Sequence, residues 1–243
     1  MTHIRYQSVQ TREGDNAEVR RLFPLPGRLM NYDPFVLWDD FTVRPGAGFP
    51  THPHRGFEAV TYLFSGEMQH RDNLGNHSTV GPGGAQRFTA GSGIEHSEMP
   101  GDEADARGIQ LWVNLPLRLK QLDPGYQEIP ATEIPQQDID GGYVRTIVGK
   151  GSPLRLHTDV HYLEVVLGDN AEYGNTVDET HQGFIYLVAG DATLGDTQLE
   201  AGDACFLETG NIWQIQSQSG CRLMVCTGTP HREPIRQHGT FVD

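Results

Sequence analysis

The chain has 243 residues and a formal net charge of −14, a length that suits one large domain or two of modest size. This charge disfavours direct binding to nucleic acid or to anionic membranes, because their phosphate groups repel it. No apolar run approaches the roughly 20 residues of a membrane-spanning helix, and the first residues lack the apolar core of a signal peptide, so a cytoplasmic location is expected. Glycine is abundant, at 29 residues, and helical periodicity is scarce, which together predict an all-β fold.

Short extended segments are expected in the first 43 residues, where turn signals such as P-L-P-G separate apolar runs. The next strands carry the most informative pattern. His52 and His54 stand two apart in one extended run, and His96 and Glu98 stand two apart in another. Because side chains two apart project from the same face of a strand, two such strands side by side would bring three imidazoles and one carboxylate together.

This set of side chains suits a metal ion. Three neutral nitrogens and one anionic oxygen favour a divalent first-row transition metal, and they leave open positions for water, dioxygen or a chelating substrate. A closed structural zinc site would more often contain cysteine, which this segment lacks. One H-x-H alone would be better explained by unconnected surface histidines, but the second pair at matching spacing favours a metal site.

A second carboxylate is expected near the same site. Counting by two from His52 along the run that ends at Phe64 places Glu58 on the histidine face, so Glu58 is predicted to point toward the metal. His70 and His77 lie among Asp, Asn and Gly residues and are interpreted as solvated turn residues. A strand over residues 108–115 would close this barrel, and the polar, proline-punctuated stretch 120–140 would contain a domain boundary.

The second half of the chain repeats the pattern of the first. Y-L-F-S-G-E at residues 62–67 recurs as Y-L-V-A-G-D at 186–191, and Gly83 and Gly91 keep the same spacing as Gly202 and Gly210. The positions that correspond to His52, His54, Glu58, His96 and Glu98 are occupied by Thr176, Asp178, Gln182, Ile215 and Ser217. No histidine is retained, so the second copy is expected to fold without a transition metal.

Two motifs resemble those of the cupins, which are small double-stranded β-barrels of the jelly-roll type. G-x5-H-x-H-x3-E-x7-G at residues 46–66 resembles the first cupin motif, and G-x-G-x-x-H at 91–96 resembles the second. H-P-H-R-G-F-E, T-A-G-S-G-I-E-H-S-E-M-P, L-W-V-N-L-P and the ending E-P-I-R-Q-H-G-T-F-V are similar, more narrowly, to the pirin family. The resemblance implies two tandem cupin barrels, with a metal-binding barrel over residues 1–125 and a metal-free barrel over 126–243.

The resemblance also implies a ligand set and an activity. Pirins use two histidines of the first motif and the His and Glu of H-x-E, which correspond to His52, His54, His96 and Glu98 here. Glu98 and Glu58 are then candidate proton acceptors, and a buried pairing of Glu58 with an arginine or a backbone donor is the alternative. Iron(II) is the first expectation for the ion, with nickel, manganese, copper and zinc as alternatives.

Two functions of different kinds follow from the family resemblance. Several pirins act as quercetinases, which open the central ring of a flavonol with dioxygen and release carbon monoxide, and we expect that activity here, with a small aromatic substrate. Other pirins are iron-dependent regulators that act through protein partners, which is the alternative. A non-redox cupin, such as an isomerase or a metal store, would use the same four ligands.

Overall fold

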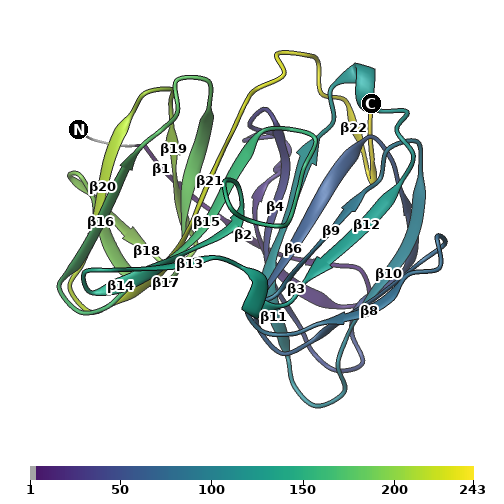
Figure 1. Ribbon diagram of the computed structural model, residues 1–243, viewed down its shortest axis with the longest axis horizontal. Coiled ribbons are helices and arrows are strands. Elements are labelled where there is room, and N and C mark those ends of the chain that lie inside the picture. The colour runs from purple at the N-terminus through teal and green to yellow at the C-terminus, as the bar shows by residue number, and fades with distance from the viewer. Residues whose placement is uncertain (1–3) are drawn as a thin grey trace. The chain divides into compact units, whose positions relative to one another are not determined.

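The computed structural model describes residues 4–243 and confirms the predicted all-β fold (Figure 1). The described chain divides into two compact units. The first unit comprises Val9–Glu133 and His231–Asp243, and the second comprises residues 4–8 and Ile134–Pro230. No helix in the described part of the chain is long and apolar enough to cross a membrane.

Antiparallel strands in three sheets build the first unit. The seven-stranded sheet has the order β12-β9-β6-β11-β4-β3-β2, the four-stranded sheet has the order β5-β10-β7-β8, and β22 pairs with β23. The bounds are β2 (Val9–Glu13), β3 (Ala17–Phe23), β4 (Phe35–Val43), β5 (Phe49–His54), β6 (Phe57–Ser65), β7 (Met68–Asp72), β8 (His77–Val80), β9 (Ala85–Thr89), β10 (Ile94–Pro100), β11 (Ala106–Asn114), β12 (Gly125–Ile129), β22 (Gln237–His238) and β23 (Phe241–Val242), with 3-10 helices η1 (Leu117–Leu119) and η2 (Ala131–Glu133).

Two clusters of buried apolar side chains lie in this unit. One is built around Phe41 and Met68, and the other around Phe57 and Trp112. The strands that supply these clusters are rich in β-branched and aromatic residues, which suit a pleated surface that is covered on both faces. Between the clusters lies a cavity of about 580 Å³, lined by members of both.

The boundary between the two barrels that the sequence predicts, at residue 125, falls within strand β12. This strand pairs with β9, with Tyr126 opposite Phe88, and therefore extends the seven-stranded sheet of the first unit. The stretch interpreted as a polar connector thus contributes a strand to the barrel that contains the histidines. The last residues of the chain also belong to this unit, since the amide N–H of Val242 donates to the carbonyl of Arg55.

The second unit repeats the arrangement in a ten-stranded sheet. Its strands β16 and β20 pair as β5 and β10 do in the first unit. The bounds are β1 (Arg5–Gln7), β13 (Gln136–Ile139), β14 (Gly142–Val148), β15 (Val160–Leu167), β16 (Ala171–Thr176), β17 (Gln182–Leu194), β18 (Thr197–Glu200), β19 (Asp203–Leu207), β20 (Ile212–Ser217) and β21 (Cys221–Gly228). Its interior is one apolar cluster, in which Ile215 is fully buried beside Trp213.

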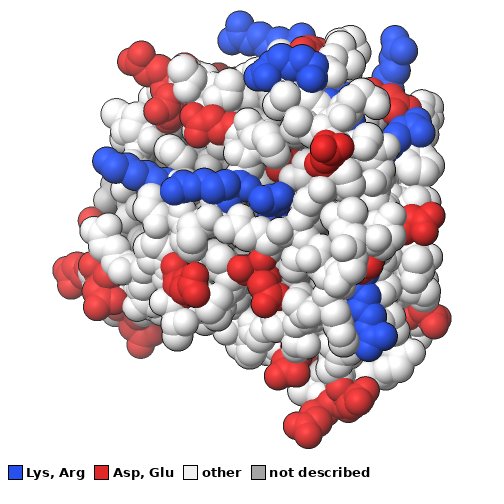
Figure 2. Space-filling model, turned by 45° about the vertical axis from the view of Figure 1, so that its right-hand side comes forward, with Lys and Arg blue, Asp and Glu red and all other residues white. Residues whose placement is uncertain are grey.

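The surface contains both signs of charge. On the face shown in Figure 2, Asp and Glu side chains are spread widely, and Lys and Arg side chains lie in several separate groups between them. A protein that binds the nucleic-acid backbone usually gathers its basic side chains on one face or along one stripe. On this face acidic side chains lie between the basic groups, and the net charge of the chain is −14. Both features disfavour binding to the nucleic-acid backbone.

Candidate metal centre

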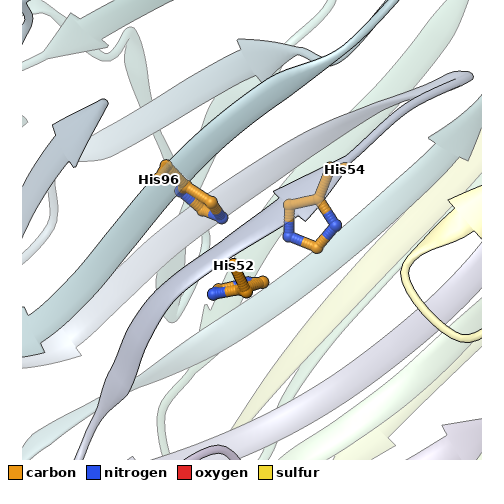
Figure 3. A group of neighbouring side chains, drawn as sticks. All are labelled: His52, His54 and His96. Carbon is orange, nitrogen blue, oxygen red and sulfur yellow. The ribbon is translucent and has the colours of Figure 1, made fainter. Parts of the chain in front are cut away.

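Strands β5 and β10 bring the three predicted histidines together. The two strands pair with His96 directly opposite His52, and His54 lies two residues further along β5. Because opposite residues and residues two apart share one face of a sheet, all three side chains project from that face, and their rings lie close together (Figure 3). One nitrogen from each ring lies within 4.8 Å of the corresponding nitrogens of the other two. These three residues form a site suited to a metal ion.

Each of these imidazoles has a partner at Nδ1. His52 Nδ1 lies 2.7 Å from the carbonyl oxygen of Pro50, and His54 Nδ1 lies 3.2 Å from that of Thr240. Since a carbonyl oxygen only accepts, both nitrogens carry the hydrogen. His96 Nδ1 faces His70 Nδ1 at 3.5 Å. The Nε2 atoms are therefore the nitrogens left for a metal ion.

The surroundings keep the rings of His54 and His96 uncharged. Burial, and secondarily the neighbouring His52, lowers the pKa of His54 to about 3 despite the hydrogen bond to Thr240. Burial and the neighbouring histidines also place the pKa of His96 well below its ordinary value. His96 Nε2 is buried and has no hydrogen-bond partner among residues 4–243. A buried, unpaired lone pair is costly unless a ligand satisfies it, so this set of three imidazole donors fits a divalent transition metal.

Glu98 lies in the same cavity, but other side chains hold its carboxylate. It is 5 % exposed and lines the cavity with His52 and His54. Gln86 Nε2 donates to Glu98 Oε1, and Thr61 Oγ1 lies 3.0 Å from the same oxygen. Gln110 Nε2 donates to Oε2 at 3.4 Å. His52, His54 and Glu98 thus line one cavity, and Oε2 is the less engaged oxygen of the Glu98 carboxylate.

The residues that hold Glu98 were not identified from the sequence. Thr61 is directly opposite Gln86 on β9 and Gln110 on β11, so the three form one polar row across adjacent strands. Thr61 and Gln110 stand in strands that are otherwise mostly apolar. A buried polar residue in an apolar strand needs a hydrogen-bond partner. The polar residues in these strands were therefore the sequence signal for a buried hydrogen-bond network.

Glu58 does not face the cavity, so the count by two across Gly56 is wrong. Gly56 has φ of +85° and separates β5 from β6. The alternation of side chains between the two faces of the sheet therefore does not continue from β5 into β6. Thr61 lines the cavity, and Glu58, three residues away on the same strand, projects to the other face. There the hydroxyl of Thr89 donates to Glu58 Oε1 at 2.7 Å. Glu58 is thus buried and hydrogen-bonded, as in the alternative, but the donor in this hydrogen bond is the hydroxyl of Thr89 and not an arginine or a backbone N–H.

His70 also differs from its expected place. It was interpreted as a solvated turn residue, but it lies on β7 with its side chain fully buried. Its ring stacks on Tyr126 with centroids 4.1 Å apart, and its Nε2 lies 3.1 Å from Asp72 Oδ2. The signal in the sequence was the spacing of two between His70 and Asp72, the same strand spacing as in the ligand pairs.

The rest of the cavity combines apolar walls with one ionic group. Phe41, Phe49, Met68 and Trp112 are among the apolar lining residues. Arg21, Asp39 and Glu13 also line it. Arg21 donates to both carboxylate oxygens of Asp39, at 2.8 and 2.7 Å, and pairs with Glu13 at 2.7 Å.

Comparisons with known proteins agree with this geometry. The profile of the pirin family matches residues 16–113, and that of the pirin C-terminal cupin domain matches residues 162–243. The chain is 41% identical to human pirin (Homo sapiens) over 242 residues, which cover 95% of this chain and 83% of the human protein. These matches confirm the predicted pair of cupin domains.

Solved structures give the same result. The crystal structure of a quercetin 2,3-dioxygenase from Acinetobacter baumannii superposes with a TM-score of 0.90 at 29% identity, covering 99% of this chain and 91% of that one. A bacterial pirin from Escherichia coli in complex with nickel(II) superposes with a TM-score of 0.77, covering 94% of this chain and 99% of that one. The latter is 21% identical, so its likeness concerns the fold.

Proposed function

The chain belongs to the pirin family, and we propose that it is a metal-dependent dioxygenase of flavonol-like substrates. His52, His54, His96 and Glu98 would hold the ion, with iron(II) as the first candidate. The observation that carries the proposal is the cluster of three imidazoles at a cavity of about 580 Å³, which His52, His54 and Glu98 line. That volume lies within the usual range for small-molecule sites, and the quercetin 2,3-dioxygenase from Acinetobacter baumannii shares the fold.

When bound, the ion supplies a Lewis acid for an enolic oxygen and the redox chemistry that dioxygen requires. The protein supplies orientation and a proton acceptor. Glu98 lines the cavity with His52 and His54, and it would accept the hydroxyl proton of the substrate. Thr61 and Gln86 hold Oε1, so Oε2 is the oxygen better placed to bind the ion or the proton.

Glu58 is assigned a structural role in this proposal. Its carboxylate accepts a hydrogen bond from Thr89 on the face of β6 away from the cavity. Nearby Arg87 is also buried, which lowers its pKa, while Glu58 opposes that shift by its charge. A buried carboxylate requires such partners to offset the cost of its burial, and proton transfer from a substrate in the cavity would not reach Glu58 directly.

The cavity walls favour a flat aromatic molecule with several hydroxyl groups. Phe41, Phe49 and Trp112 provide apolar contact area. Asp39 and Glu13 neutralise the positive charge of Arg21. The three side chains can form hydrogen bonds with hydroxyl groups, but they carry no net positive charge that would attract a strongly anionic substrate. The physiological substrate would then be a neutral phenolic or enolic compound.

Oxygen uptake with quercetin tests the proposal. The purified protein would be freed of metal and reloaded with iron, nickel, manganese or copper one at a time, with His52→Ala as the control. Metal-dependent uptake that is absent from the variant is expected. No uptake with any ion at full occupancy would contradict the dioxygenase function, and would favour the alternative of a regulatory protein that acts through a protein partner.

A further inference from the structure

Strand β7 places two buried titratable side chains next to the metal centre that the proposed reaction does not use. It pairs with β10, so that Asp72 lies opposite His96 and His70 lies opposite Glu98. Opposite residues share a face of the sheet, so His70 and Asp72 project from the same face as the two proposed ligands. Both side chains are 0% exposed.

Asp72 acts as an acceptor at the end of a hydrogen-bond chain. Its carboxylate receives the backbone N–H groups of Leu74 and Asn76, the side-chain amide of Asn76 and Nε2 of His70. Burial raises its pKa, but the hydrogen bonds from Asn76 and His70 outweigh this and hold the pKa below its usual value. An ionised carboxylate only accepts, so Nε2 of His70 carries its hydrogen toward Asp72.

The direction of the hydrogen bond from His70 to Asp72 also decides which nitrogen of His96 carries its hydrogen. A neutral imidazole with hydrogen on Nε2 has a lone pair on Nδ1, and His70 Nδ1 faces His96 Nδ1 at 3.5 Å. His96 Nδ1 must then carry the hydrogen, which leaves a lone pair on His96 Nε2. That nitrogen is the buried one without a hydrogen-bond partner among the described residues. The opposite polarity would place a hydrogen on the nitrogen that the metal needs.

We propose that His70 and Asp72 are positioning residues, which fix His96 in the tautomer with hydrogen on Nδ1 and so keep its Nε2 available to the metal. Tyr126 holds the plane of the His70 ring by stacking on it at 4.1 Å. Carbonyl oxygens do the same for His52 and His54, so His96 is the one proposed histidine ligand oriented through a side chain. The inference rests on the metal-binding part of the proposed function and is independent of the substrate.

Nitrogen NMR of the metal-free protein tests the tautomer directly. Long-range proton–nitrogen spectra of uniformly labelled protein distinguish the two imidazole nitrogens of His96, and we expect the hydrogen on Nδ1. In His70→Phe, which retains a ring against Tyr126 but has no acceptor, we expect that tautomer to be lost or mixed. In His70→Gln the amide oxygen can accept from His96 and the amide N–H can donate to Asp72, so the wild-type tautomer should persist.

Metal titration of the same proteins gives a second readout. Loss of a side chain that orients a metal-bound histidine typically weakens affinity 10- to 100-fold, which is the change expected for His70→Phe with nickel(II) as the probe. His70→Gln should recover affinity to within about threefold of wild type. His77→Phe is the matched control, because it makes the same substitution at an exposed histidine of the neighbouring strand β8. Its His96 tautomer should be unchanged.

Three results would overturn the inference. They are a hydrogen on Nε2 of His96 in the wild-type protein, wild-type tautomer and affinity in His70→Phe, and equal loss of affinity in the Gln and Phe variants. The first requires no variant, so the test remains valid if His70→Phe does not fold. Correct tautomer behaviour without oxygen uptake on quercetin would instead contradict the dioxygenase function and leave the positioning role intact.

Discussion

The carbonyl oxygen of Thr240 lies 3.2 Å from Nδ1 of His54, although the two residues are 186 positions apart in the chain. The last residues reach this place through two further contacts. The N–H of Val242 donates to the carbonyl of Arg55, and the buried ammonium of Lys120 donates to the carbonyl of Val242 at 2.9 Å. The C-terminal tail therefore orients one of the proposed metal ligands.

Gly56 is expected to be indispensable for this arrangement. It has φ of +85°, and a Cβ atom there would lie 1.8 Å from the carbonyl oxygen of Val242. Gly56→Ala should displace the tail, destabilise the protein by about 2 kcal/mol or more, and weaken metal binding because His54 loses its acceptor. Thermal unfolding and metal titration measure both effects.

Gly46→Ala is the matched control for this prediction. Gly46 has φ of +84° but nothing within 4 Å of its Cβ position, so its substitution adds the backbone strain without the clash. We expect it to leave metal affinity unchanged. Equal affinity in Gly56→Ala and Gly46→Ala would show that the tail does not orient His54.

We expect Lys120 to make the stability of the first unit depend on pH in the alkaline range. Burial lowers the pKa of its ammonium to about 8, although the charges of Asp243 and Glu233 oppose the shift. In the unfolded chain its pKa is about 10.4. At pH values between these two pKa values, Lys120 is largely protonated in the unfolded chain and largely unprotonated in the folded protein. Raising the pH therefore favours the folded state. Lys120 therefore costs most stability below pH 8, and this cost disappears as the pH rises toward 10.4.

Urea unfolding of the wild type and of Lys120→Met at pH 7.5 and 9.5 measures this contribution. The difference in unfolding free energy, wild type minus variant, should increase by about 2 kcal/mol over that interval. Other titrating groups are common to both proteins and cancel in the difference. A difference that does not change with pH would mean that the three oxygen acceptors of Lys120 keep its pKa at the ordinary value.

Glu98→Gln should weaken the metal more than Glu58→Gln does. The first change removes a negative charge from the cavity that contains the histidines, whereas Glu58 faces Thr89 on the other side of the strand. We expect a loss of affinity of tenfold or more for Glu98→Gln, on the order of 1.4 kcal/mol, and little change for Glu58→Gln. Calorimetric titration of both variants with the same ion decides between them; equal affinities or the reverse order would remove Glu98 from the ligand set.

Removal of the metal, or the substitution His52→Ala, should leave the fold largely intact while metal binding is lost. His52 is partly exposed, and backbone pairing holds β5 against β10. In the second unit the equivalent strands β16 and β20 pair with the apolar Ile215 at the position that corresponds to His96. Circular dichroism and thermal unfolding of the metal-free proteins measure this; unfolding on metal removal would contradict it.

Much of the site follows from local rules that can be applied to the sequence. The spacing of two in His52/His54 and in His96/Glu98 places each pair on one face of its own strand, and the structure brings the three histidines together in one cluster. The glycine and turn pattern likewise predicts the strands and their repetition in the two halves. These features depend on residues that are close in sequence, so no tertiary information is needed.

Only the tertiary structure decided which distant residues support those ligands. The turn at Gly56 restarts the alternation and sends Glu58 to the far face, which a count along the sequence does not reveal. The polar row of Thr61, Gln86 and Gln110 exists because three strands align in one register. His70, Tyr126 and Thr240 reach the site from β7, β12 and the C-terminal tail. Alternation within a strand is a local property, whereas register and strand order arise from packing of the whole barrel.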